Sequence, residues 1–263
     1  MNKLFVIKIG GNVIDNNDAL QSFLKNFTAV EGKKILVHGG GKIATAMGEK
    51  SGIQPNYTNG RRITDDETID LVTMVYGGLI NKKIVAKLQS LQCNALGLTG
   101  ADGNIIPAVK RPVKDVDFGW VGDVESSKVE VHSLQLLLEG NFVPVFAPLT
   151  HDEQGRILNT NADTIASSLA VALSAIYNVR LIYCFEKKGV LENVEDESSV
   201  IPLITKEKYR QLLAEEKLFA GIIPKIDNAF AAIDAGVKEV LIGDAKDLLT
   251  NVGTNTAGTL LKN

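Results

Sequence analysis

Residues 35 to 42 read ILVHGGGK, an apolar run that ends in three glycines and a lysine. The apolar run predicts a buried strand, and residues 42 to 51 predict a helix. Three adjacent glycines cost backbone entropy on folding, and a lysine at the start of a helix faces the positive end of the helix dipole. Both features are explained if this turn binds an anion, such as a phosphate or an acidic substrate.

Further apolar runs of the same kind alternate with helical patterns. Together with the run at 34 to 39, these predicted strands lie at 4 to 9, 94 to 100, 142 to 148, 180 to 185 and 238 to 243. Such strands are typical of a mostly parallel sheet covered on both faces. Covering helices are predicted at 16 to 28, 42 to 51, 65 to 90, 133 to 140, 162 to 176, 205 to 217 and 224 to 236. Residues 104 to 131 lack a helical period and predict a β-hairpin or small meander. The sequence therefore predicts an α/β fold.

The helix predicted at 65 to 90 carries two further signals. Thr64 and Glu67 have the spacing of a capping box. Gly77 and Gly78 interrupt the middle of the helix, so it is expected either to cross a partner helix closely in a dimer or to kink within the core. Its apolar stripe consists of Ile69, Val72, Val75, Leu79, Ile84 and Leu88.

Composition excludes several classes of protein. The chain has 263 residues, a formal net charge of -3 and a pI near 5.7, whereas nucleic-acid binders usually carry a concentrated basic surface. Cys93 and Cys184 are too few for a disulfide framework and lack metal-ligand spacing, which favours a reducing cytoplasm. No stretch has the character of a signal peptide or the length of a membrane span. We expect a cytosolic protein with neither nucleic acid nor membrane as a partner.

Glycine turns follow three of the predicted strands, with the sequences KIGGN (8 to 12), HGGGK (38 to 42) and TGADG (99 to 103). Ligands of open α/β sheets bind beyond the carboxyl ends of the strands, where glycines let the backbone approach a phosphate or carboxylate. Neither a P-loop nor a dinucleotide fingerprint is present. Each turn taken alone is also compatible with simple tight-turn geometry.

Two lysines lie in electrostatically unfavourable positions. Lys8 falls inside the apolar strand VIKIG, where a buried ammonium group needs an anionic partner unless the strand is at a sheet edge and the side chain reaches water. Lys225 follows Pro224, which suits the first turn of a helix, so Lys225 also faces the positive end of a helix dipole. Both positions favour a bound anion.

Polar residues before two predicted helices complete the set. Asn161 is placed to cap the helix at 162 to 176, and Asp163 falls in its first turn, a position that the dipole alone would favour. Asn159 precedes the cap and is free to reach a ligand. Arg61 and Arg62 follow a glycine in NGRRIT, where one guanidinium could hold a carboxylate and the other could face solvent.

The polar residues fit one kind of chemistry better than others. His38, His132 and His151 show no zinc spacing, and no Ser-His-Asp or Cys-His arrangement is visible. Cations that converge without a nucleophile are what phosphoryl transfer requires, because its catalysis consists mostly of positioning and charge neutralisation. The sequence therefore favours a phosphoryl-transfer site.

The order of motifs KIGGN, HGGGK, NGRRIT, FGWVGDV, NTNADT and GIIPKIDNA resembles the amino acid kinase family, above all its members that act on N-acylated glutamate. The resemblance covers nearly the whole chain. It implies a three-layer αβα sandwich that forms a single domain, residues 1 to 263. Within it, a lobe at 1–178 would bind the acidic substrate and make a dimer contact, and a lobe at 179–263 would bind ATP with Mg²⁺. The implied reaction is phosphorylation of the γ-carboxylate.

The resemblance also implies roles for individual residues. The residues that would act on the transferring phosphoryl group are Lys8 and Lys225, with Asp163 orienting both. The residues that would hold the N-acylglutamate are Gly40, Gly41, Arg62 and Asn159. Those that would lie against the phosphates or the nucleotide are Gly10, Gly11, Glu186 and Gly189. The metal would be held mainly by the nucleotide, with no protein ligands.

Two stretches depart from the family pattern. In CFEKKGVL (184 to 191), Glu186 stands where the family usually has aspartate, which affects the expected adenine or ribose contacts. Ala101 stands where many relatives have lysine, so the acyl group is either acetyl or a larger group such as succinyl. The chain starts at its first strand, without the N-terminal helix of arginine-inhibited hexamers, and we expect a homodimer. A non-catalytic sensor of nucleotide or amino acid is the alternative function.

Overall fold

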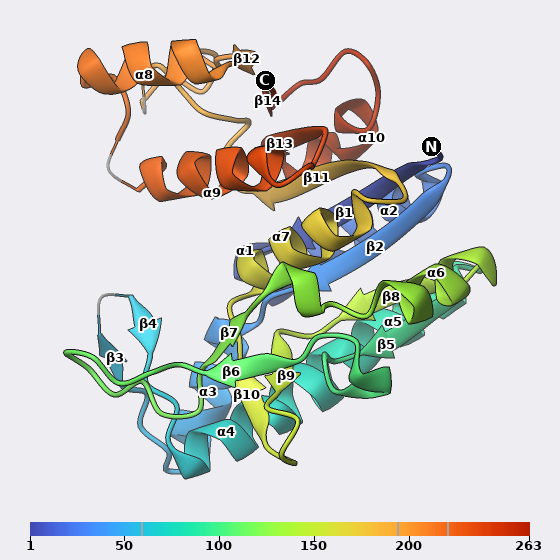
Figure 1. Ribbon diagram of the computed structural model, residues 1–263, viewed down its shortest axis with the longest axis vertical. Coiled ribbons are helices and arrows are strands. Elements are labelled where there is room, and N and C mark those ends of the chain that lie inside the picture. The colour runs from blue at the N-terminus through green and yellow to red at the C-terminus, as the bar shows by residue number, and fades with distance from the viewer. Residues whose placement is uncertain (59, 194, 220) are drawn as a thin grey trace.

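The computed structural model describes residues 1–58, 60–193, 195–219 and 221–263, and Asn59, the first residue of NGRRIT, lies outside them. The described residues form one eight-stranded central sheet (Figure 1). The strands are, in spatial order, β12 (Leu203–Ile204), β14 (Thr259–Leu261), β13 (Glu239–Asp244), β11 (Asn178–Phe185), β1 (Lys3–Ile9), β2 (Lys33–His38), β8 (Val143–Phe146) and β5 (Ala95–Leu98). All six predicted strands are confirmed.

The sheet is mostly parallel, as predicted. Strands β13, β11, β1, β2, β8 and β5 pair in parallel, and only the pairing of β13 with β14 is antiparallel. Strand β1 lies between β11 and β2, with Lys8 opposite Tyr183 on one side and Val37 on the other. The alternative that Lys8 lies on an edge strand is therefore wrong.

Helices cover both faces of the sheet and make the three layers that the sequence resemblance implies. One core contains Leu4 and Val6 of β1 together with the helices α6 (Val131–Glu139), α7 (Ala162–Leu173), α8 (Lys206–Ala214) and α9 (Ile223–Asp234). The other core contains Phe5 and Ile7 together with α2 (Asn17–Ala29), α3 (Gly41–Lys50), α4 (Asp66–Val72), α5 (Asn81–Ser90) and α10 (Leu248–Asn251). Alternate residues of β1 thus serve opposite faces, because successive strand side chains point to opposite sides.

The short elements are helix α1 (Gly11–Asp15) and the 3₁₀ turns η2 (Asp102–Asn104), η3 (Ser126–Lys128) and η4 (Ala245–Asp247). Three small antiparallel hairpins are β3 (Tyr57–Thr58) with β4 (Arg61–Arg62), β6 (Ala108–Lys110) with β7 (Gly122–Val124), and β9 (Leu149–His151) with β10 (Ile157–Asn159). They lie in the lower part of Figure 1, beyond the arrowhead of β2. The β6–β7 hairpin confirms the prediction for residues 104 to 131.

The long helix predicted at 65 to 90 is continuous but contains a π-helical segment, η1 (Thr73–Ile80), between α4 and α5. A π segment uses i→i+5 hydrogen bonds and so takes more residues for each turn. The buried stripe consequently passes from Val75 and Tyr76 to Ile80 rather than to Leu79, which is only half-buried. The prediction of Leu79 as a stripe position was wrong because it assumed α-helical spacing throughout.

The cap of this helix also differs from the prediction. Asp65 is the N-cap residue, and its carboxylate accepts a hydrogen bond from Thr68 N at 2.8 Å. Thr64 is fully buried one residue earlier and belongs to the site described below. The motif positions the helix start correctly to within one residue, but the aspartate accepts the bond because its side chain precedes the first helical turn.

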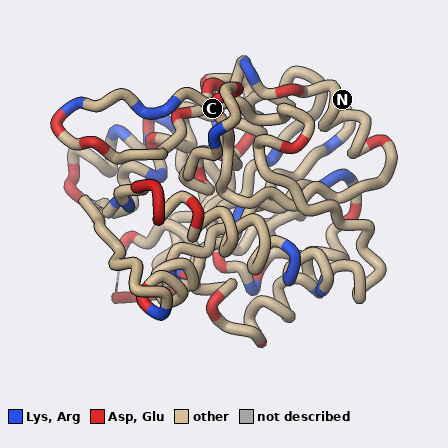
Figure 2. Tube along the Cα trace, turned by 90° about the horizontal axis from the view of Figure 1, so that it is seen from below, with Lys and Arg blue, Asp and Glu red and all other residues tan. Residues whose placement is uncertain are grey.

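Charged residues are spread along the chain. Figure 2 shows positive and negative residues interspersed along the visible trace, and in that view no large region of the molecule carries only one sign of charge. Within the described ranges, every helix is too short or too polar to cross a bilayer.

Candidate active site

Two cavities meet at the carboxyl ends of β1 and β2. The polar cavity, of about 420 Å³, is bordered by Lys8, Arg62, Tyr76, Asn159, Asp163 and Asn228, among others. The apolar cavity, of about 470 Å³, is bordered by Val13, Glu186, Leu191, Phe219, Ile222, Lys225 and Ile242, among others. Gly10, Gly11 and Gly41 border both. A group bound in one cavity can therefore reach a group bound in the other across these glycines.

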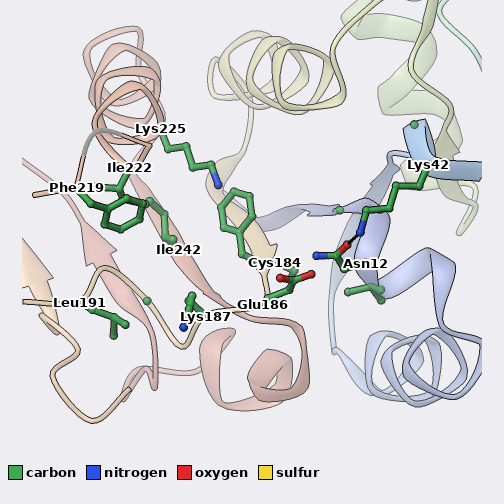
Figure 3. Close-up of a pocket in the computed structure, with 16 residues that line it drawn as sticks. Asn12, Lys42, Cys184, Glu186, Lys187, Leu191, Phe219, Ile222, Lys225 and Ile242 are labelled. Atoms are coloured by element: carbon green, nitrogen blue, oxygen red, sulfur yellow. Dashed lines mark hydrogen bonds between the residues drawn. The ribbon is translucent and has the colours of Figure 1, made fainter. Parts of the chain in front are cut away.

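The apolar cavity has two ends of different character (Figure 3). Leu191, Phe219, Ile222 and Ile242 gather at one end, which suits a flat apolar ring. Lys42 and Asn12 lie at the other end, where the Lys42 ammonium donates a hydrogen bond to the Asn12 side-chain oxygen. Lys225 projects from α9 toward the middle. The lysine that follows the three glycines thus faces the same cavity as Lys225.

Lys8 and Asp163 form an ion pair at the junction of the cavities. Lys8 Nζ lies 2.8 Å from Asp163 Oδ1, and Lys8 is only 8% exposed. Asp163 lies in the first turn of helix α7, whose N-cap Asn161 accepts hydrogen bonds through its side-chain oxygen from Asp163 N at 2.7 Å and Thr164 N at 3.3 Å. The predicted anionic partner of Lys8 is therefore Asp163, and the predicted cap of α7 is confirmed.

Lys225 approaches the same point from the opposite side. Pro224 lies in the first turn of α9, as predicted, and Lys225 follows it. Burial lowers the pKa of Lys225; the charge of Asp163 opposes this effect, and the charge of Lys8 adds to it. A smaller cavity bordered by Asp163, Tyr183, Phe185, Lys225 and Asn228 links the two groups. The structure thus brings the three predicted catalytic residues together.

The glycine turns after β1 and β2 lie against each other. Gly39 N donates to Ile9 O at 3.1 Å, which ties the two strand ends together. Gly40 has a φ of +152°, and a Cβ there would lie 2.3 Å from Ile80 Cδ1. Gly41 starts α3, and a Cβ built on it meets no atom within 4 Å. Gly40 is therefore required by packing, whereas Gly41 is open toward both cavities.

His38 fixes the start of the second turn. It is fully buried, its Nδ1 lies 2.8 Å from Gly39 O, and Asn81 Nδ2 lies 3.2 Å from its Nε2. Desolvation lowers the pKa of His38 to about 4. A neutral ring that donates from Nδ1 and accepts at Nε2 satisfies both contacts. His38 therefore acts as a neutral support for the glycine turn and is not a proton carrier.

Arg62 points into the polar cavity and Arg61 borders its rim. Arg62 Nη2 donates to Gly41 O at 3.1 Å and to Thr45 Oγ1 at 2.8 Å, and the guanidinium stacks 4.8 Å from the Tyr57 ring. These contacts orient the guanidinium beside the glycine turn. Arg62 is buried and Arg61 exposed, in line with the prediction that the two arginines have different roles.

Asn159 lies at the end of β10, across the polar cavity. Its Nδ2 donates to Thr64 Oγ1 at 3.0 Å, and its backbone N donates to Trp120 O at 2.8 Å. Trp120 N in turn donates to Thr64 O at 2.6 Å. The FGWVGDV motif therefore joins the Arg62 segment to the Asn159 segment, which explains why a motif without catalytic side chains belongs to the pattern.

Glu186 and Gly189 border the apolar cavity, but for different reasons. The negative charge of Glu186 partly opposes the lowering of the Lys225 pKa that burial causes. A Cβ on Gly189 would lie 2.6 Å from Thr259 Oγ1 and 3.0 Å from Thr259 N, so close packing against β14 requires this glycine. Thr259 Oγ1 accepts from Val190 N at 2.8 Å and fixes the turn.

The third glycine turn does not join the site. TGADG follows β5, which lies beyond β8 at the sheet edge, and a Cβ on Gly100 would lie 2.7 Å from Ile106 O. Ala101 does not border the polar cavity, so the expectation that it shapes the acyl pocket receives no support. Pro148, which lies between β8 and β9, borders the cavity instead. The sequence shows which turns follow strands, but not which strands are neighbours.

The bordering residues that were not predicted include Tyr76 of η1, Phe185 of β11 and Asn228 of α9. Burial raises the pKa of Tyr76. Of these three, the sequence pointed only to Asn228, because it lies three residues after Lys225 and therefore on the same helix face.

The sequence profile described as "Amino acid kinase family" matches residues 3–244. The chain belongs to the amino acid kinase family. It is 55% identical over 263 residues to a protein named acetylglutamate kinase from Cytophaga hutchinsonii, covering 99% of both chains.

Solved structures share the fold of this chain. The crystal structure of smu.665 from Streptococcus mutans UA159 is 30% identical, with a TM-score of 0.77 and 98% of each chain covered. Carbamate kinase from Giardia lamblia bound to AMP-PNP is 15% identical, with a TM-score of 0.72, covering 100% of this chain and 99% of that one. The family and the αβα fold expected from the motifs are both confirmed.

Proposed function

We propose that this protein transfers the γ-phosphoryl group of ATP to the γ-carboxylate of N-acetyl-L-glutamate, the phosphorylation step of arginine biosynthesis. One observation carries the proposal: the polar and apolar cavities share Gly10, Gly11 and Gly41, and Lys8, Asp163 and Lys225 surround their junction. The relative from Cytophaga hutchinsonii, which bears the name of this activity, matches the chain from end to end.

The acidic substrate would occupy the polar cavity. Arg62 offers its guanidinium for the α-carboxylate, since a planar fork matches carboxylate geometry. Asn159 bonds Thr64 through its side-chain nitrogen, so its amide oxygen would accept from the acylated nitrogen. Gly40 and Gly41 let the substrate lie close to the backbone at the start of α3. The γ-carboxylate would then point toward Lys8.

ATP would occupy the apolar cavity, with its adenine at the end formed by Leu191, Phe219 and Ile222 and its phosphates directed to Gly10 and Gly11. The residues at the adenine end of this cavity all lie after residue 178, which supports the proposed division into two lobes. Glu186 and Gly189 would lie beside the sugar and the phosphates.

The reaction needs charge stabilisation and no general base. The γ-carboxylate is ionised at neutral pH, so one of its oxygens forms a bond to the γ-phosphorus while the bond from that phosphorus to the bridging oxygen of ADP breaks. No proton moves in this step. Lys8 and Lys225 would neutralise the negative charge of the phosphoryl oxygens, and Asp163 would hold Lys8 in place through its ion pair. The products are an acyl phosphate and ADP.

Magnesium would enter with the nucleotide. Across the ranges that the structure describes, no group of three or more His, Cys, Asp or Glu side chains converges as a metal site. This donor set fits a cation held by ATP phosphates and water, a usual arrangement for Mg²⁺. When bound, the cation neutralises phosphate charge.

The proposal also includes the oligomeric state and location of the protein, a homodimer in the cytoplasm. A Cβ built on Gly77 would lie 3.4 Å from Leu149 Cδ1, whereas a Cβ built on Gly78 meets no described atom within 4 Å. Met74 of the same π segment is 63% exposed. The open side of this segment is suited to close approach of a second helix. Cys93 and Cys184 are both buried and free, which suits a reducing compartment.

The test is ADP release by the purified protein with ATP and Mg²⁺, using N-acetyl-L-glutamate, N-succinyl-L-glutamate and free L-glutamate in parallel. We expect turnover with the acetylated substrate and at least tenfold lower kcat/KM with free glutamate. A preference for the succinylated substrate would keep the reaction and change the acyl group. No turnover with any of them, combined with tight ATP binding, would support the sensor alternative.

A further inference from the structure

The ring of Phe185, the last residue of β11, lies beside both lysines of the junction. Lys225 Nζ is 3.6 Å from the ring centroid, and Lys8 Nζ is 5.3 Å from it. The ring is itself supported by Tyr183, whose ring stacks on it with centroids 6.1 Å apart and planes at 25°. Phe185 borders the apolar cavity and the small cavity that also contains Asp163.

We propose that Phe185 is a positioning residue whose ring holds the ammonium groups of Lys8 and Lys225 at the junction when no phosphate is bound. The proposal rests on the proposed function in one respect, namely that these lysines act on the transferring phosphoryl group. The family motifs do not point to it, because Phe185 lies in the stretch where this chain departs from the family pattern.

The electrostatics of the junction explain why such a group is needed. The ammonium groups of Lys8 and Lys225 converge on the Asp163 carboxylate. Lys8 forms the ion pair with it, at 2.8 Å. Within the described part of the chain, no carboxylate lies within 4.0 Å of Lys225 Nζ. The charged groups that act on Lys225 are Asp163 of α7, Lys8 of β1 and Glu186 after β11. Its nearest favourable contact is therefore the electron-rich face of the Phe185 ring.

A ring is better suited to this place than a second carboxylate. A carboxylate in contact with Lys225 would bind the ammonium strongly and would repel the incoming triphosphate. An aromatic ring attracts a cation more weakly and carries no net charge, so a phosphate oxygen can displace it. Phe185 can thus keep Lys225 pointing to the junction between turnovers without competing with ATP.

The first test measures the pKa of Lys225 without any assay of activity. Acetylation of the protein by limiting acetic anhydride across a pH series, read by mass spectrometry of the Lys225 peptide, gives this pKa. Phe185→Leu should lower it by roughly 0.5 to 1 pH unit, the equivalent of a threefold to tenfold change in protonation expected for one cation–π contact. Phe185→Tyr should leave it unchanged. Phe219 borders the same cavity, and among the described residues no lysine ammonium lies over its ring. Phe219→Leu should therefore also leave the Lys225 pKa unchanged.

The second test measures the pH dependence of kcat. Phe185→Leu should lower kcat about tenfold and change KM for N-acetyl-L-glutamate less than twofold. The alkaline limb of its pH profile should move to lower pH by the same amount as the Lys225 pKa measured by acetylation. Phe185→Tyr should restore both values. An unchanged Lys225 pKa in Phe185→Leu, or equal losses in the Leu and Tyr variants, would overturn the proposal. Failure of the wild type to phosphorylate any acylglutamate would refute the proposed function instead, and the labelling result would still decide the role of the ring.

Discussion

Replacing Lys8 by methionine tests the centre of the proposed mechanism. Lys8→Met keeps the length and apolar stem of the side chain but removes the ammonium group that lies 2.8 Å from Asp163 Oδ1. Removing one charge-stabilising donor from a transition state costs about 10² to 10³ in kcat, or roughly 2.7 to 4 kcal/mol. We expect a loss of this size, because Lys8 is one of only two lysines proposed to reach the transferring phosphoryl group.

The expected loss of stability is smaller. Leaving one partner of a fully buried ion pair unpaired costs about 3 to 5 kcal/mol. The Asp163 side chain is 29% exposed, lies in the first turn of α7, and also feels the charge of Lys225, so water, the helix dipole and a second lysine all compensate it. We expect the free energy of unfolding to fall by about 1 to 2 kcal/mol, which corresponds to a Tm decrease of roughly 2 to 8 °C for a chain of this size.

Lys34 provides a matched control. It is also a lysine within a central strand and is also 8% exposed, but it donates to Thr28 O at 3.0 Å and Val30 O at 2.6 Å at the end of α2, away from both cavities. Lys34→Met leaves these carbonyls without their charged donor and should cost about 1 to 3 kcal/mol of stability. Its kcat should remain within twofold of wild type.

Urea unfolding and steady-state kinetics with saturating ATP and N-acetyl-L-glutamate give both quantities for each variant. The reasoning fails if Lys8→Met retains more than about a third of wild-type kcat. It also fails if both variants lose kcat in proportion to their loss of stability, since Lys8 would then be a structural residue like Lys34.

Two further changes test the walls of the polar cavity, and a third tests the buried support of its glycine turn. Arg62→Lys loses the planar fork that donates to Gly41 O and should raise KM for N-acetyl-L-glutamate at least tenfold with kcat changed less than threefold, as initial rates will show. Gly40→Ala forces a Cβ to 2.3 Å from Ile80 Cδ1 and should destabilise the fold by about 2 kcal/mol in urea while raising the same KM; wild-type stability would contradict the packing argument. Burial lowers the pKa of His38 from 6.5 to about 4, so between these values the unfolded chain binds a proton that the folded chain does not. The free energy of unfolding should therefore fall by about 3 kcal/mol more from pH 7 to pH 4 in wild type than in His38→Asn, and equal slopes for the two proteins would exclude a neutral buried ring.

The sequence predicts the framework of this protein well because its strands are buried on both faces. A strand such as β2 has no solvent-facing alternation, so its run of apolar residues is visible without knowledge of its neighbours. The carboxyl ends of parallel strands share one edge of the sheet. For this reason the residues after β1 and β2 could be expected to lie together. The cap at Asn161 and the turn at Pro224 depend only on local backbone geometry and were likewise predictable.

Other features depend on contacts that are distant in sequence. Strand order decides that the turn after β5 lies away from the cavities and that Lys8 is central. The antiparallel strand β14 and the two-residue strand β12 are too short to have a period of their own. The contact of Phe185 with two lysines joins β11, β1 and α9, and no single segment contains a sign of it.

The π segment η1 bears on how this chain can change in length. An α-helix completes a turn in 3.6 residues and a π segment needs more, so loss of one residue from 73 to 80 would allow α-helical hydrogen bonding while α4 and α5 keep the faces that they turn to the core. Asn81, which follows the segment, would then keep its contacts with His38 and Val145 O. Tyr76 lies inside the segment and borders the polar cavity, so it would be displaced. A one-residue deletion here should therefore leave the fold intact and change the shape of the cavity.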